Sequence, residues 1–161
     1  TGDAYLDAIH RTWQDAFNTT DKSKPVADCA AMGLEAEWLP DGSLSTIFRS
    51  PGMITHPRTG ERIWFNQIST TTICVDSVGP ERFALQDGYY GTTKPRPYET
   101  TYNDGGQIPR DQVSALYRVL LKYTVKFPWS QNDILLVDNY VTAHGRNSYT
   151  GLRDVQVALL A

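Results

Sequence analysis

The sequence has few cysteines, no excess of basic residues and no long apolar run. Cys29 and Cys74 are the two cysteines of the chain; they lie far apart and form no C-x-x-C pair. A disulfide framework is therefore not expected, and we predict two buried free thiols in a reducing cytoplasm. A net charge of −3 and a pI near 5.5 provide no basic surface for nucleic acid.

Apolar runs long enough to cross a membrane do not occur, and the first residues lack the charged-then-apolar pattern of a secretory signal. We expect a cytoplasmic protein with neither membrane nor nucleic acid among its partners. The 161 residues, 40% of them hydrophobic, suffice for one compact core.

Apolar periodicity predicts a mainly β fold with peripheral helices. A period near 3.6 predicts helices at 3–17, 25–32 and 109–122, the second ending at Gly33 and the last starting at a proline. Alternation predicts strands at 34–39, 44–49, 62–68, 123–129, 134–137 and 155–160. Turns are expected at 40–42 and at 130–133, where Asn132 can adopt a left-handed conformation. An immunoglobulin-like sandwich fits this strand pattern almost as well as a jelly roll.

A stretch without periodicity, 86–109, separates the strands from the last helix. It contains several glycines and prolines together with Tyr89, Tyr90, Tyr98 and Tyr102. Loops of this length inside a compact domain are often lids or binding loops, although disorder without function is the competing explanation. The tyrosines favour a loop that packs over a substrate or a carrier.

Around residues 133–161, two apolar segments bracket a polar connection that holds His144, Arg146 and Arg153. A neutral imidazole binds iron, and a guanidinium can hold a carboxylate by two parallel hydrogen bonds. This spacing alone is weak, because a lone histidine before a strand is more often a surface or hydrogen-bonded residue. His56 precedes Pro57, which favours extended backbone, and we expect a turn residue there rather than a metal ligand.

The combination of motifs resembles the taurine dioxygenase-like (TauD/TfdA) family of Fe(II)- and 2-oxoglutarate-dependent oxygenases. The C-terminal motif comprises Asp138-Asn139, His144-Gly145-Arg146, Arg153 and an apolar last segment. Upstream motifs resemble the subgroup of syringomycin-type amino-acid hydroxylases: Trp13-Gln14, His56-Pro57, Thr59-Gly60-Glu61 and Trp64-Phe65-Asn66-Gln67.

The resemblance implies a double-stranded β-helix (jelly roll), incomplete in this chain. It also implies that His144 is the distal iron ligand and that Arg153 binds the distal carboxylate of 2-oxoglutarate. Asp138 and Asn139 would orient the strand and the histidine from behind. Arg146 is a candidate for a substrate carboxylate, with a surface salt bridge as the alternative.

Asn66 is a further candidate substrate-binding residue. A buried amide inside a strand needs hydrogen-bond partners. Either the amide bonds to loop backbone as part of a structural network, or it faces the cavity that the resemblance implies for this strand.

One departure from the family pattern is large. Family members carry an H-x-D or H-x-E motif upstream of the distal histidine, and none of His10, His56 and His144 has an acid two positions on. We favour the interpretation that residues 1–161 are the C-terminal portion of one oxygenase domain, whose N-terminal part supplies this motif. The alternative is a degenerate member that no longer binds iron.

The expected reaction of the longer parent is hydroxylation of an amino acid, free or tethered to a carrier protein, in secondary metabolism. Halogenation and desaturation are variants that this sequence does not discriminate. A function of another class, a non-catalytic jelly-roll module that binds a small acid or a protein, is favoured by the lack of two iron ligands.

Overall fold

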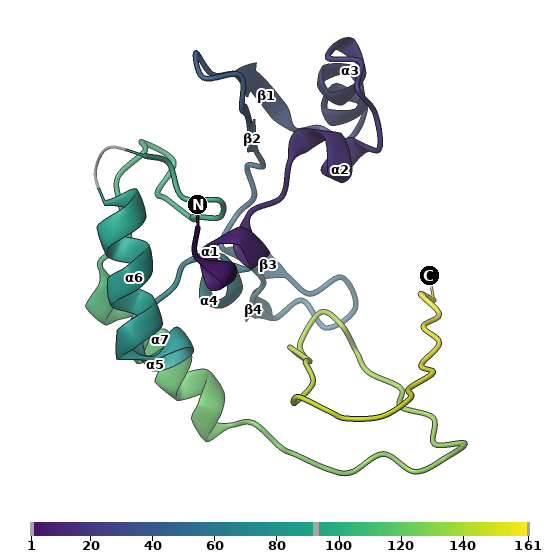
Figure 1. Cartoon of the computed structure of the whole chain (residues 1–161). Helices are drawn as coiled ribbons and strands as arrows, with labels where there is room; N and C mark the ends of the chain where they lie inside the picture. Colours follow the sequence, from purple (N-terminus) through teal and green to yellow (C-terminus); the bar gives the residue numbers. More distant parts are fainter. Residues whose placement is uncertain (1, 92–93, 161) are drawn as a thin grey trace.

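The computed structural model describes residues 2–91 and 94–160 (Figure 1). Short helices and two small hairpins make up the first three quarters of the chain, and an extended segment follows the last helix. The elements are α1 (Ala4–Ile9), α2 (Trp13–Phe17), α3 (Ser23–Ala31), β1 (Glu35–Trp38), β2 (Leu44–Ile47), β3 (Met53–Thr55), β4 (Arg62–Trp64), α4 (Ile68–Thr71), α5 (Val75–Val78), α6 (Pro80–Tyr90) and α7 (Arg110–Lys122). None of the helices in these ranges is long and apolar enough to cross a membrane.

The N-terminal residues form two helices, so the single helix predicted for 3–17 is wrong. Asp3 caps α1, and α1 ends where His10 turns to extended backbone. Thr12 then caps α2, its hydroxyl accepting from the backbone N–H of Asp15 at 3.1 Å. A capping threonine satisfies an amide that would otherwise lack a partner, and the new start competes with continuation of the first helix.

The first hairpin follows the sequence pattern closely. Helix α3 ends before Gly33, which has a φ of 72°. Strands β1 and β2 pair antiparallel with Glu35 opposite Ile47, and Gly42 supplies a positive φ in the turn between them. The predictions for 25–32, 34–39, 40–42 and 44–49 are therefore confirmed in position; the strands are shorter by two residues each, and the helix begins two residues earlier and ends one residue earlier than predicted.

The second hairpin pairs β3 with β4, with Ile54 opposite Ile63. Strand β3 was not predicted, and the strand predicted for 62–68 is wrong beyond Trp64. Asn66 ends that strand: its Nδ2 donates to the Gly52 carbonyl at 2.8 Å, and its Oδ1 accepts from the Ile68 N–H at 3.1 Å. An asparagine that bonds to nearby backbone in this way competes with the strand ladder, and α4 begins two residues later.

Helices α5, α6 and α7 pack together, with α4 against α7 (Figure 1). Val113 of α7 is buried, as are Tyr90 of α6 and Cys74 before α5. The helix predicted for 109–122 is confirmed, because apolar residues line one face and Pro109 precedes the first turn. Cys29 and Cys74 are both free and buried, as predicted.

Helix α6 corrects the prediction of an irregular stretch over 86–109. Residues 86–90, with Tyr89 and Tyr90, belong to the helix, and Pro80 stands at its first position. Gly88 and the polar face concealed the helical period, whereas Gly79-Pro80 was the signal that could have revealed its start. Residues 92–93 of the predicted loop lie outside the described residues. Beyond them, Tyr98 and Tyr102 are exposed, and a bridge between Thr101 and Gln107 closes a small turn.

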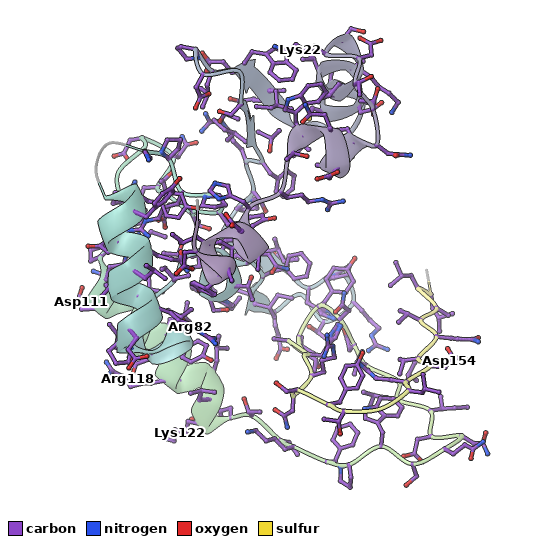
Figure 2. All side chains as sticks on the ribbon, viewed as in Figure 1. Lys22, Arg82, Asp111, Arg118, Lys122 and Asp154 are labelled. Carbon is purple, nitrogen blue, oxygen red and sulfur yellow. The ribbon has the colours of Figure 1, made fainter. Side chains whose placement is uncertain are left out.

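Beyond α7 the described chain forms turns but no helix or strand, so the strands predicted for 123–129, 134–137 and 155–160 are not present in residues 123–160. A strand is stable when a neighbouring strand pairs with its backbone, and these segments have no such neighbour among the described residues. The turn at 130–133 is confirmed, with Asn132 at a φ of 71°. Asp154, labelled in Figure 2, lies on this segment, well separated from Arg82 and Lys122 on the helices.

The two sheets are separate and two-stranded, with orders β1-β2 and β3-β4. The peripheral helices are confirmed. Helix exceeds strand among the described residues, so the mainly β content that we predicted is not found in them, and two-stranded sheets do not make a complete jelly roll.

Candidate functional site

The sequence-predicted site residues all lie after α7, except Asn66. Asp138 and Asn139 open a turn in which the N–H groups of Val141 and Thr142 donate to the Asp138 carbonyl at 3.2 and 3.1 Å. His144, Arg146 and Arg153 follow; all three are exposed and lie outside any helix or strand. Asn66 is only half-buried, and both ends of its amide bond to backbone, so a role toward substrate remains a prediction.

His56 joins this turn to the second hairpin, and the sequence did not indicate that contact. Its side chain is only 3% exposed, and its Nε2 lies 3.2 Å from Oδ2 of Asp138, 82 positions later. The residue opens a turn as predicted: its N–H donates to the Glu61 carbonyl at 2.8 Å, and its carbonyl accepts from the Gly60 N–H at 3.0 Å. Buried imidazoles need partners for both ring nitrogens, and this one has them.

The partners of Nδ1 assign the tautomer of His56. The backbone N–H groups of Arg58 and Thr59 both point at Nδ1, at 3.2 and 3.0 Å. A nitrogen that receives two N–H donors must be the acceptor, so the ring proton resides on Nε2. Nε2 therefore donates to Asp138, and the turn at 56–61 aims this hydrogen bond at the C-terminal segment.

Asp138 uses both carboxylate oxygens. Oδ1 accepts from the Tyr140 N–H at 3.0 Å, while Oδ2 accepts from His56 and lies 3.7 Å from Nη2 of Arg58. The Tyr140 N–H holds the pKa of this carboxyl below its ordinary value of 3.8; desolvation opposes the shift, and His56 and Arg58 add smaller lowering effects. Arg58 is 83% exposed, so its ion pair adds little.

Aromatic contacts complete the junction. The Tyr140 ring meets the His56 ring edge-on, with centroids 5.4 Å apart, and stacks on Phe65 at 5.8 Å. Such pairs add to the free energy gained by burial alone. We call His56, Phe65, Asp138 and Tyr140 the docking cluster, since they join the C-terminal segment to the β3–β4 hairpin.

Arg146 and Arg153 come together over one ring. Their guanidinium carbons lie 4.8 and 5.2 Å from the centroid of Tyr149. Each guanidinium is a planar cation whose N–H groups suit a carboxylate.

Iron is the cofactor that the resemblance implies, and the described residues fit only one position of its site. No group of three or more His, Cys, Asp or Glu in residues 2–91 and 94–160 could hold a metal ion. A facial iron site needs two histidines and a carboxylate, so His144 could supply one imidazole of such a site.

Comparisons with known proteins identify the family. The model of the family "Taurine catabolism dioxygenase TauD, TfdA family" matches residues 4–159. The chain belongs to the TauD/TfdA family. Its resemblance to that family, drawn from the motifs, is thereby confirmed, and membership implies a jelly-roll fold for the whole domain.

Two relatives align with nearly the whole chain. The dapdiamide synthesis protein DdaC of Enterobacter agglomerans is 33% identical over 149 residues, covering 92% of this chain and 44% of the relative. A clavaminate synthase-like protein of Arabidopsis thaliana is 27% identical over 152 residues, covering 94% of this chain and 42% of the relative. The chain thus spans less than half the length of either relative.

Proposed function

We propose that residues 1–161 are the C-terminal portion of an Fe(II)- and 2-oxoglutarate-dependent dioxygenase domain. The observation that carries the proposal is the family match over residues 4–159. The missing part of the domain supplies the H-x-D/E motif and two of the three iron ligands. In the intact protein, bound iron and 2-oxoglutarate supply the oxygen-activating chemistry.

Within this proposal, His144 is the distal iron ligand and Arg153 binds the far carboxylate of 2-oxoglutarate. His144 has no hydrogen bond or ion pair within the described residues, so its imidazole is free to take a ligand role. Arg153 is exposed and its guanidinium lies over the Tyr149 ring, and a fork of N–H donors matches a carboxylate. Arg146 and Asn66 would contact substrate, while Asp138 and Asn139 orient the segment.

Exposed apolar side chains after α7 support the proposal that another part of the domain covers this segment. Ile134 and Leu136 are 94% and 80% exposed, and Val157 and Leu159 are 81% and 89% exposed. Apolar patches of this kind mark surfaces that another part of a protein covers. We propose that these two segments become strands of the jelly roll when the remainder of the domain pairs with them.

The substrate we propose is an amino acid, free or tethered to a carrier protein, and the reaction is hydroxylation. The relatives' names refer to dapdiamide synthesis and to clavaminate synthase, which supports a place in secondary metabolism. The free thiols Cys29 and Cys74 support a cytoplasmic location.

A non-catalytic jelly-roll binding module is the second candidate. The absence of a three-ligand cluster from the described residues favours it. The two functions are separated by anaerobic titration of the complete protein with Fe(II) and then 2-oxoglutarate. The weak visible charge-transfer band of the ternary complex is expected for the oxygenase. If the intact, folded protein shows no such band, or if its complete coding sequence lacks H-x-D/E, the binding module is the function that remains.

A further inference from the structure

The docking cluster connects two parts of the chain that the sequence keeps far apart. Asp138 accepts the hydrogen bond from His56 and lies near Arg58, both of the β3–β4 hairpin. Tyr140 contacts the rings of His56 and Phe65. His144 lies four positions beyond Tyr140, two residues after the turn that Asp138 opens. The place where that turn is held therefore sets where the segment with His144 and Arg153 begins.

We propose that His56 is a positioning residue that holds the Asp138 turn and thereby places His144; the part that concerns iron rests on the proposed function. His56 acts through Asp138 and does not itself bind the metal. Its buried ring faces two ways: Nδ1 organises its own turn, and Nε2 holds the C-terminal segment. One residue thus links the geometry of the hairpin to that of the site.

The contact between His56 and Asp138 differs from an ordinary surface ion pair. An exposed histidine–carboxylate pair contributes little, whereas this imidazole is nearly inaccessible and receives two backbone donors at Nδ1. Those donors fix the tautomer that presents an N–H to Asp138. Outer groups that orient a ligand in this way affect metal affinity without touching the metal.

Two conservative variants separate the two ends of the ring. In His56→Asn, the amide oxygen replaces Nδ1 as acceptor, but the shorter side chain has no donor that reaches Asp138. In His56→Gln, the amide nitrogen replaces Nε2 and reaches Asp138, while the acceptor for Arg58 and Thr59 is lost. Both are made in the complete protein, and backbone amide hydrogen exchange is measured residue by residue.

We expect His56→Asn to speed exchange at Tyr140, Val141 and Thr142 by about tenfold, as for loss of a hydrogen bond to a charged group, while Arg58 and Thr59 stay protected. His56→Gln should show the reverse pattern. Asp138→Asn should reproduce the effect of His56→Asn on the turn, and the double variant should add nothing to it. Equal exchange in the two His56 variants at 140–142 would overturn the docking role.

Iron affinity then tests the positioning role. His56→Asn should raise the Kd for Fe(II) about tenfold, while His56→Gln stays within about twofold of the wild type. If the turn loosens but the Kd is unchanged, the proposed function stands and positioning by His56 is wrong. If the wild type binds no Fe(II), the proposed function is wrong, positioning toward iron falls with it, and the exchange data still decide whether His56 docks the segment.

Discussion

The chain before residue 123 and the chain after it differ in how their apolar side chains are covered. In the first region, Val113 of α7 and Tyr90 of α6 are 1% and 2% exposed. In the second, Ile134 and Val157 are almost fully exposed, although both belong to alternating apolar runs. Helices satisfy their own backbone and need only a face to pack against, whereas strands also need a paired neighbour. The difference shows that alternation specifies a face and that pairing decides whether the strand forms.

The largest effect should come from His144, the exposed residue of the second region that we expect to act. In the complete protein, His144→Ala should weaken Fe(II) binding by more than about a hundredfold, since loss of a ligand exceeds the loss of an outer partner. Anaerobic titration monitored by the charge-transfer band measures it. His10→Ala is the matched control, because that histidine contacts Tyr90 in the first region. Equal loss in both variants would contradict a ligand role for His144.

Two valines test whether the contrast in burial persists in the complete domain. Val113→Ala should lower the free energy of unfolding by about 2 kcal/mol, from lost burial and the cavity left behind. Val157→Ala should cost less than about 0.5 kcal/mol if its side chain stays exposed, as in this structure. We expect a cost near that of Val113 instead, because the remainder of the domain would cover Val157. Chemical denaturation of the complete protein measures both, and a negligible effect of Val157→Ala would contradict the proposed pairing.

The sequence predicted some parts of the molecule well, and the reasons are local. Helix α7 and the β1–β2 hairpin carry their own signals, namely a proline at the helix start and a glycine with positive φ in the turn. Helix α6 was missed because its buried face includes the polar Gln86, which breaks the apolar period. Strand 62–68 was extended too far, because the backbone bonds of Asn66 are not visible in an alternation pattern.

The residues of the candidate site could be predicted only where their type and order match a family motif. The motif around His144 and Arg153 suggested the family, which the comparison confirmed. His56 was correctly expected at a turn, but its bond to Asp138 depends on a contact across 82 positions. A single sequence contains periodicity and turn signals, whereas a contact of this range is determined by the packing of whole elements.

The two arginines over Tyr149 provide a sharper test within the second region. Arg153→Lys should raise the Kd for 2-oxoglutarate about tenfold, because an ammonium cannot form the bidentate pair. Arg146→Lys, which loses an equivalent contact with the same ring, should change that Kd by no more than about twofold. Calorimetry of the Fe(II)-loaded complete protein measures both values. A larger effect at Arg146 would mean that Arg146, and not Arg153, binds 2-oxoglutarate.

The smallest expected effect concerns the contact between the two regions at acid pH. The Tyr140 N–H and His56 hold the pKa of Asp138 below 3.8, so the carboxylate favours the docked turn above that value. This contribution is fully present above the unfolded pKa and is lost as pH falls through the lower, folded pKa. Amide exchange at Tyr140 between about pH 5 and pH 2 should therefore show a loss of protection, after correction for intrinsic rates. Asp138→Asn should lack this acid-dependent step, while Asp154→Asn, on the same exposed segment, should retain it. A carboxyl carbon of Asp138 that titrates at or above 3.8 would mean that the docked turn gives the carboxylate no advantage, and the two regions would then be joined mainly by the Tyr140 ring.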